Sequence, residues 1–334
     1  MPDLFLTFDV EDFIKEKSFL ILKQILDILD DAELRGLFFI TGHMADKLKS
    51  YPELKQRLSN HEIGYHSTAH SVRPLIIEYT DVEDYCESIE ISLKRETSRI
   101  SPTTGEILGP GGLLSLKELF PKKSIVSFRA PGFAWSPPML EALTKVGIKY
   151  DFSTSLKTGP LFYKGIQFYP FPIVLCPPDG YPFNMRTLAR SIRVTLSNGT
   201  AVLLLHPTSL TNQEHWDSIY FRGNPKELVS AKDIDQQEER RQIKGFSLFV
   251  ERISSLKKAG LIDVTPPFRN ASKYLKPTRE LVDKLYSDSV QWGIGNFSCK
   301  PSFLHSHYLH FFGIENSHKR VGIMTLNRLK KNSS

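Results

Sequence analysis

Cysteine is scarce in this chain of 334 residues: Cys86, Cys176 and Cys299 are three residues that stand far apart. Three widely spaced cysteines exclude a disulfide framework and a zinc site built on paired cysteines. A chain without structural disulfides is typical of a reducing compartment, so we expect a cytoplasmic protein.

Long hydrophobic runs are also missing from the sequence. The apolar stretches GLFFI and AVLLL are far too short to cross a bilayer, and they predict buried strands. The first residues, MPDLFLTFDVED, contain no basic segment followed by an apolar stretch, so no secretory signal is expected.

Basic and acidic residues balance over most of the chain, so residues 1–269 carry no net charge. The net charge of +6 lies entirely in residues 270–334, which hold ten basic and four acidic residues. Such a tail is usually a solvated surface, and the alternative is weak contact with an anionic membrane or a lipid-linked substrate. Basic residues are not interleaved with aromatic ones, so no nucleic acid is expected as a partner.

Apolar stretches alternate with helical patterns as far as about residue 265. The predicted strands are Leu4–Phe8, Gly36–Ile40, Glu62–Tyr65, Ile125–Phe128, Lys149–Phe152, Phe168–Val174, Ala201–Leu205 and Leu261–Val264. The predicted helices are Leu20–Leu34, Met44–Leu58, Asp81–Thr97, Pro138–Val146 and Gln236–Ala259. Repeated strand–helix units indicate an α/β fold with a parallel sheet, here an incomplete (β/α) barrel of about seven strands.

Two stretches interrupt this alternation. Ser101–Ser124 is rich in glycine and proline and predicts a long loop over the barrel mouth, and Leu175–Arg193 is expected to be irregular. The alternation ends at Thr265–Pro267. We therefore predict a barrel over residues 1–265 and a basic, aromatic-containing C-terminal extension over residues 266–334.

Five predicted strands each end in an ionisable residue. In chain order these residues are Asp9, His66, Arg129, Asp151 and His206. The carboxyl ends of the strands of a parallel barrel share one face, where catalytic groups gather. The sequence therefore predicts one site that contains all five side chains.

The stretch HEIGYHSTAH holds three histidines at positions 61, 66 and 70. His66 and His70 are four residues apart, so on one helical turn they point the same way, as two imidazole ligands of a metal must. The DVED run at residues 9–12 offers carboxylates to complete such a site. His61 begins its strand at the opposite end, and we expect it to be structural.

The motifs TFDVED, HEIGYHSTAH, FRAPGFAWS, YDFS and LLLHP follow one another between residues 4 and 207. Together they resemble the ordered motifs of the polysaccharide deacetylase (NodB-homology) family, carbohydrate esterase family 4. The resemblance implies a deformed (β/α) barrel and one divalent metal ion, with zinc favoured over cobalt, nickel or iron.

The same resemblance implies the metal ligands. His66 and His70 would be two of them. The family commonly has two adjacent aspartates where this chain has DVED, so the third ligand stays open. Glu11 is slightly favoured because residues i and i+2 share a strand face, and Asp12 takes its place if the strand turns sharply.

Resemblance also implies the catalytic roles. Asp9 would be the base, Arg129 would orient it, His206 would be the general acid and Asp151 would tune His206. The tryptophan that the family often has near the YDFS motif is missing here.

These residues imply a hydrolase that removes N-acetyl groups from an amino sugar of a glycan, glycolipid or glycan precursor. Two alternatives are hydrolysis of a cyclic amide such as allantoin or an imide, and glycan binding without catalysis. Trp135 either stacks on a sugar or packs at a helix start, and Trp216 carries no positional signal. His305, His307 and His310 are expected to be ordinary histidines rather than a second metal site.

Overall fold

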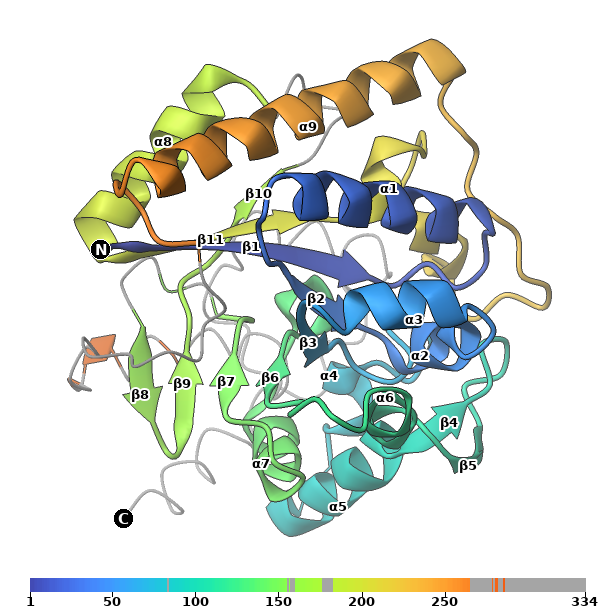
Figure 1. Cartoon of the computed structure of the whole chain (residues 1–334). Helices are drawn as coiled ribbons and strands as arrows, with labels where there is room; N and C mark the ends of the chain where they lie inside the picture. The colour runs from blue at the N-terminus through green and yellow to red at the C-terminus, as the bar shows by residue number, and fades with distance from the viewer. Residues whose placement is uncertain are drawn as a thin grey trace.

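The computed structural model describes residues 1–82, 84–154, 156, 160–175, 183–264, 278, 280–281 and 285. Their main feature is a curled sheet of nine strands in the order β10-β11-β1-β2-β3-β6-β7-β9-β8 (Figure 1). The strands are β1 (Asp3–Val10), β2 (Leu37–Ile40), β3 (Glu62–Tyr65), β6 (Ser127–Phe128), β7 (Tyr150–Asp151), β8 (Leu161–Tyr163), β9 (Ile166–Phe168), β10 (Ile173–Val174) and β11 (Thr200–Leu205). Neighbouring strands are parallel except β8 and β9, which form an antiparallel hairpin.

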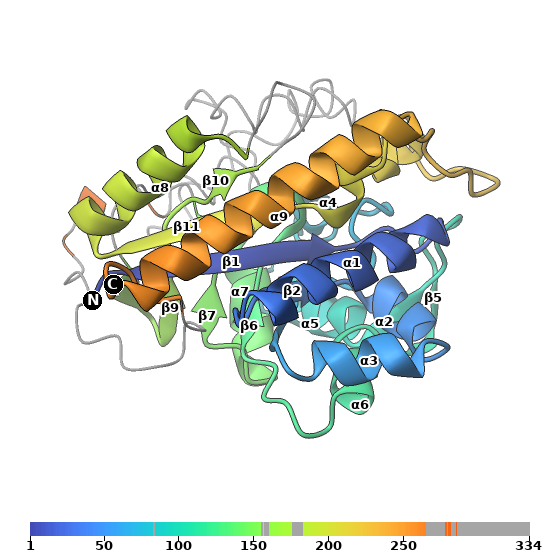
Figure 2. The same ribbon diagram turned by 45° about the horizontal axis from the view of Figure 1, so that its top comes forward.

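Helices cover the outside of this sheet, and three of them, α1, α8 and α9, lie over β1 and β11 (Figure 2). The helices are α1 (Lys17–Asp31), α2 (Gly42–Leu48), α3 (Pro52–Leu58), α4 (Ile76–Tyr79), α5 (Tyr85–Glu96), α6 (Leu113–Leu119), α7 (Pro137–Lys145), α8 (Met185–Asn198) and α9 (Gln236–Lys258). Shorter 3₁₀ turns are η1 (Pro131–Phe133), η2 (Pro207–Leu210) and η3 (Trp216–Tyr220), and a separate hairpin joins β4 (Ser98–Ile100) to β5 (Ile107–Pro110). No helix of the described residues combines the length and apolarity needed to cross a bilayer.

Strand β1 shows how the sheet separates the core from the site. Its even-numbered residues from Leu4 to Val10 join the large core under the helices. Its odd-numbered residues face the inside of the curl, where Phe5 belongs to a smaller aromatic cluster. Successive strand residues point to opposite faces. Thr7 and Asp9 therefore follow Phe5 toward the inside of the curl.

The predicted α/β class and the curled barrel of parallel strands are confirmed by the structure. Apolar spacing locates the helices well because each buries one stripe: in α1 the buried residues include Leu22, Ile25, Leu26 and Leu29. Strand β3 has the predicted bounds.

Three predicted elements are wrong in their extent, and proline explains two of them. The helix predicted for Met44–Leu58 is two helices, because Pro52 starts a new one. The strand predicted for Phe168–Val174 is divided into β9 and β10 on either side of two prolines. Leu261–Val264 forms only an isolated bridge, between Asp263 and the first residue of β1.

Two predicted loops also contain regular structure. Ser101–Ser124 holds β5 and α6, whose LLSLKEL sequence buries four side chains. Leu175–Arg193 contains the start of α8, and its residues 176–182 lie outside the described residues. The predicted boundary at residue 265 and nearly all of the extension lie outside them too, so the domain division stays a prediction.

Candidate active site

The end of β1 sends two carboxylates into the curl and one out of it. Asp9 and Glu11 face inward and are almost fully buried. Asp12 instead holds the start of α1, where it accepts hydrogen bonds from Ile14 N (3.0 Å) and Ser18 Oγ (2.8 Å). Of the two predicted third ligands, the structure brings Glu11 to the histidines, while the carboxylate of Asp12 is bonded at the start of the helix.

His66 and His70 are not joined by the helical turn that their spacing predicts. The segment between them is irregular, and Ser67 (φ 62°) and His70 (φ 46°) have left-handed backbones. The two rings nevertheless lie 5.1 Å apart, on the same side of the loop. The spacing of four residues therefore brings the imidazoles together by a different backbone path.

Glu96, at the end of α5, holds this loop in place. Its Oε1 accepts hydrogen bonds from Ser67 Oγ (3.0 Å) and Tyr79 OH (2.9 Å). Its Oε2 accepts from Thr68 N (3.0 Å) and Tyr65 OH (2.6 Å). Burial and the neighbouring Glu96 raise the pKa of both tyrosines well above its ordinary value, so both keep the proton they donate. A buried carboxylate with four donors fixes the backbone between the two histidines.

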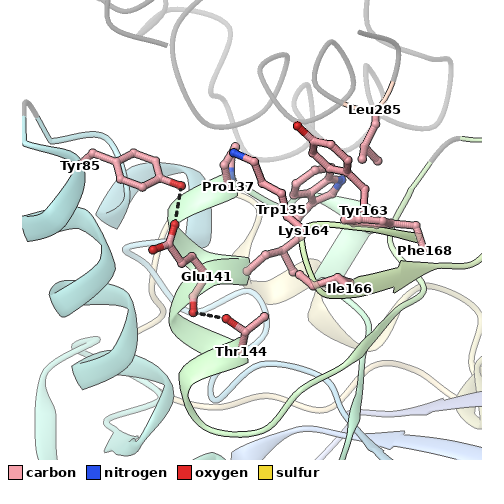
Figure 3. A pocket seen from close by; sticks show the side chains of 11 residues that line it. Tyr85, Trp135, Pro137, Glu141, Thr144, Tyr163, Lys164, Ile166, Phe168 and Leu285 are labelled. Carbon is pink, nitrogen blue, oxygen red and sulfur yellow. Dashed lines mark hydrogen bonds between the residues drawn. The ribbon is translucent and has the colours of Figure 1, made fainter. Parts of the chain in front are cut away.

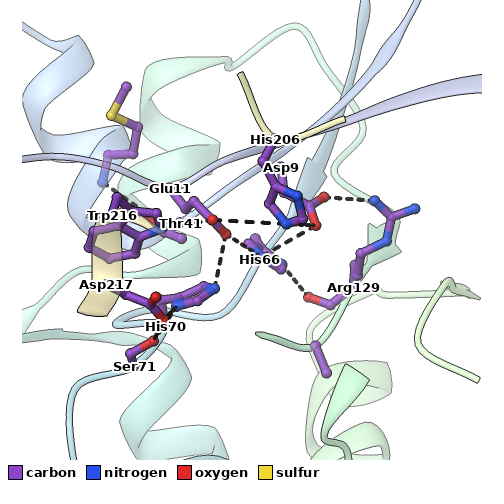
Figure 4. Close-up of polar contacts among 12 residues, drawn as sticks. Asp9, Glu11, Thr41, His66, His70, Ser71, Arg129, His206, Trp216 and Asp217 are labelled. Atoms are coloured by element: carbon purple, nitrogen blue, oxygen red, sulfur yellow. Dashed lines mark hydrogen bonds and ion pairs between the residues drawn. The ribbon is translucent and has the colours of Figure 1, made fainter. Parts of the chain in front are cut away.

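Glu11, His66 and His70 form the tightest cluster of the site (Figure 4). Glu11 Oε2 lies 3.1 Å from His66 Nε2 and 2.9 Å from His70 Nε2, and one atom of each residue lies within 4.8 Å of the others. Burial raises the pKa of Glu11, but His70 and His206 outweigh it and leave the pKa well below its ordinary value.

These three side chains fit a divalent cation. His66 Nδ1 donates to Arg129 O (2.8 Å) and His70 Nδ1 donates to Ser71 Oγ (2.6 Å), so both rings turn Nε2 toward Glu11. Metal-bound histidines are normally oriented through their second nitrogen in this way. Two imidazoles and a carboxylate are a common ligand set for zinc and related metals.

Asp9 is held from one side only. Its Oδ1 accepts from Arg129 Nη1 at 2.7 Å, while Arg129 Nη2 donates to Thr7 Oγ1 at 2.9 Å. The guanidinium lies over the Phe39 ring, 4.3 Å from its centroid. Burial lowers the pKa of Arg129, although the neighbouring carboxylate of Asp9 acts to raise it. This arrangement leaves Asp9 Oδ2 facing His66 and His206, each at 3.7 Å.

The expected pairing of Asp151 with His206 is wrong. Asp151 accepts from Ser153 N (2.9 Å) and Ser153 Oγ (2.8 Å), and although both residues are described, no ion pair joins Asp151 to His206. Burial raises the pKa of Asp151 to about 7, although the hydrogen bonds from Ser153 and the charge of Arg129 act to lower it. The carboxylates near His206 Nε2 are Asp9 (3.7 Å) and Glu11 (3.9 Å), and burial lowers the pKa of His206 despite them.

The turn η3 contributes residues that sequence reasoning missed. Trp216 Nε1 donates to Glu11 Oε1 at 2.7 Å, so this tryptophan does have a position in the site. Asp217 accepts from Ser71 Oγ and from His215 Nδ1 (2.9 Å). Burial lowers the pKa of His215, but Asp217 outweighs it and raises the pKa to about 9. The HWD triplet, which begins nine residues after the end of LLLH, was the available signal.

A separate pocket of about 220 Å³ lies between α5, α7 and the β8–β9 hairpin (Figure 3). Trp135 lines it, is almost fully buried and packs against Phe168 with ring centroids 5.8 Å apart. Tyr85 donates to Glu141 across one side of the pocket. None of the residues that surround Glu11 lines this pocket, so packing describes Trp135 better than sugar stacking.

Asp9, Glu11, His66, His70, Arg129 and His206 converge on one face of the curled sheet, in the order of the motifs that carry them. Residues 2–107 match the polysaccharide deacetylase family. This match confirms the predicted resemblance, and it contains Asp9, Glu11 and both clustered histidines. Arg129, Asp151 and His206 lie beyond it. The family name denotes hydrolysis of acetyl groups on carbohydrate.

Solved structures similar to this chain share little sequence with it. A putative polysaccharide deacetylase from Mycobacterium smegmatis is 14% identical over 85% of this chain and 90% of its own, with a TM-score of 0.44. A family 4 carbohydrate esterase from Bacillus anthracis is 19% identical over 86% and 83%, with a TM-score of 0.37. The 4-alpha-glucanotransferase of Thermococcus litoralis is 13% identical over 82% and 40%, with a TM-score of 0.50. No curated protein sequence matches the chain.

Proposed function

We propose that this chain is a metal-dependent hydrolase that removes N-acetyl groups from an amino sugar of a glycan, glycolipid or glycan precursor. The observation that carries the proposal is the convergence of Asp9 and His206 beside the cluster of Glu11, His66 and His70. The cluster provides a cation site, and the two side chains beside it provide a base and an acid.

An amide resists hydrolysis because its carbonyl is a poor electrophile and its amine is a poor leaving group. A divalent cation held by Glu11, His66 and His70, with zinc favoured, would polarise the carbonyl and lower the pKa of water toward about 7. Side chains of the protein provide the base and the acid of the reaction.

Asp9 has the position of the general base. Arg129 holds Oδ1 and leaves Oδ2 to accept the proton of the attacking water. Because Arg129 is buried and bonded to both Asp9 and Thr7, the carboxylate is held in one orientation. Fixed orientation of a base removes an entropic cost from the reaction.

His206 has the position of the general acid. The low pKa that burial gives it makes its ring neutral before the reaction, so it must first accept a proton. Asp9 Oδ2, 3.7 Å from His206 Nε2, is the nearest carboxylate oxygen to pass one on. His206 then donates that proton to the departing nitrogen, and the products are acetate and a free amine.

The proposed substrate rests on the family match. An acetylated amino sugar is the partner that the deacetylase motifs favour, and an intracellular, lipid-linked precursor suits the cytoplasmic location predicted above. Contact of the basic extension with an anionic membrane stays a prediction, since residues 266–334 lie almost wholly outside the described ones.

The test measures acetate released from N-acetylated glycans and glycolipids by the purified, zinc-loaded chain. We expect acetate from the wild type and a large loss in Asp9→Asn. Ring opening of a cyclic amide liberates no acetate, so turnover of allantoin or an imide without acetate would replace the proposal by that activity. A wild type that binds acetylated glycans without hydrolysing any of them would be a binding protein instead.

A further inference from the structure

The two carboxylate oxygens of Glu11 face two different pairs of imidazoles. Oε2 lies beside His66 and His70, the pair described above. Oε1 lies 3.9 Å from His206 Nε2 and 3.8 Å from His215 Nε2. One atom each of Glu11, His206 and His215 lies within 4.8 Å of the other two, which is the spacing of a second group of ligands.

His215 is oriented in the same way as the two histidines of the first cluster. Its Nδ1 donates to Asp217 Oδ1 at 2.9 Å, so its Nε2 is turned toward Glu11 and His206. A carboxylate that fixes the second nitrogen is the usual support of a metal-bound histidine. The His206 and His215 rings stand edge to face with centroids 5.0 Å apart, and one nitrogen of each lies within 4.8 Å of the other.

We propose that Glu11, His206 and His215 form a second cation position, which takes a divalent transition metal once the first position is filled and blocks the reaction when it is occupied. The inhibition rests on the proposed function, in which His206 Nε2 carries the proton to the leaving nitrogen. A metal on that nitrogen holds the same lone pair, so the proton transfer stops. The two imidazole ligands select zinc, copper, nickel or cobalt over magnesium and calcium.

Charge and exposure set the order of filling. Asp9, Glu11 and Asp217 are three carboxylates at the site and Arg129 is their fixed cation, so the first divalent ion balances the charge of these four side chains. The second ion then enters a site with no excess of negative charge, and it binds more weakly. It also enters from solvent, because the side chain of His215 is 44% exposed while those of His66 and Glu11 are 1% exposed.

The experiment is a zinc titration of the full chain after removal of its metal with a chelator. Bound zinc is measured by equilibrium dialysis and elemental analysis, and acetate release is measured in the same samples. We expect two equivalents of zinc on the wild type. Activity should rise with the first equivalent and fall as the second binds.

His215→Asn and His215→Gln test the assignment. Both variants should bind the first equivalent of zinc but not the second. Half-inhibition, measured relative to each variant's own maximal activity, should need at least tenfold more zinc than in the wild type. Two variants guard against a local folding defect in one of them. A matched control replaces His305, His307 and His310 by asparagine together, since these tail histidines are the other cluster in the sequence. This control should retain the second equivalent.

Three results would overturn the proposal: one equivalent on the wild type at every zinc concentration, a second equivalent that persists in both His215 variants, or its loss in the tail variant. Zinc counting needs no substrate. If no acetylated glycan is hydrolysed, the proposed function fails while the count of bound zinc still decides whether the second position exists.

Discussion

At the scale of single residues, the site separates holding a cation from moving protons. Glu11 and two histidines converge through one carboxylate oxygen. Asp9 lies beside them but is bonded to Arg129. Substitution of Asp9 should therefore affect turnover, while substitution of Glu11, His66 or His70 should affect the content of the first metal ion, and the two effects can be measured separately.

Asp9→Asn should lower kcat by about 10²- to 10⁴-fold and leave the bound metal unchanged. The amide keeps the shape of the carboxylate and a hydrogen bond to Arg129, but it cannot accept the proton of water. Elemental analysis and acetate release on the same preparation check both halves. Loss of the metal together with activity would place Asp9 among the ligands.

His61 supports a prediction about stability against pH. It is buried beneath α1, accepts a hydrogen bond from Gly36 N through Nδ1, and burial lowers its pKa to about 4. Between pH 6.5 and 4 the unfolded chain binds a proton at His61 that the folded chain does not. The free energy of unfolding should therefore fall as pH falls across this window, by up to about 3 kcal/mol from this residue.

The matching variant is His61→Asn, whose amide oxygen replaces Nδ1 as the acceptor. Urea unfolding of both proteins at several pH values between 4 and 7 isolates the contribution of this residue. The variant should show a shallower decline toward acid than the wild type. Parallel declines would assign the acid sensitivity to other groups.

At the scale of elements, the 3₁₀ turn η3 supports the metal cluster from a distance in sequence. Asp217 accepts from Ser71, which accepts from His70, and it also accepts from His215. Trp216 in the same turn holds Glu11. Two of the three residues in the cluster therefore depend on one short turn after β11.

Asp217→Asn should weaken zinc affinity by about 10- to 100-fold, since a neutral amide orients the histidines less firmly than a carboxylate does. Competition with a chromogenic chelator measures the change. The matched control is Asp233→Asn on the same connection, where Asp233 pairs with Lys15 and Lys17 outside the site. Equal losses in the two variants would mean that the whole connection, rather than Asp217, sets the affinity.

Sequence reasoning located the strand-end residues because each follows a short apolar run, and parallel strands bring such ends together. It missed η3 because nothing periodic marks the HWD triplet. That turn is placed by tertiary contacts such as Lys15 Nζ to Asn212 Oδ1 (2.9 Å) on the same connection. It misplaced Asp151 because a family role was transferred to a side chain whose neighbour Ser153 occupies both of its oxygens.

At the scale of the whole molecule, the site joins segments from both ends of the described barrel. Glu11 follows the first strand, while His206 and η3 follow β11, which pairs directly with β1. A cation in the cluster links Glu11, after β1, to His66 and His70, after β3, and these segments come together only on folding.

Removal of the metal should lower the thermal unfolding midpoint, because a cation that binds only the folded state stabilises it. At 100 times its dissociation constant the gain is about 2.7 kcal/mol. Differential scanning calorimetry with chelator and with added zinc checks this. His66→Asn is the control, and its midpoint should respond weakly to zinc. The same unfolding midpoint with chelator and with added zinc would contradict a metal site within the fold of the wild type.

Glu96 also affects how the protein acquires its metal. Glu96 accepts two hydrogen bonds from the loop between the two histidines and is itself fixed by Tyr65 and Tyr79, so the loop does not need an ion to keep its shape. An emptied protein should stay folded, and one metal should replace another without unfolding. The ion that each molecule carries would then be decided by exchange with the metals around it throughout its lifetime, rather than once during synthesis.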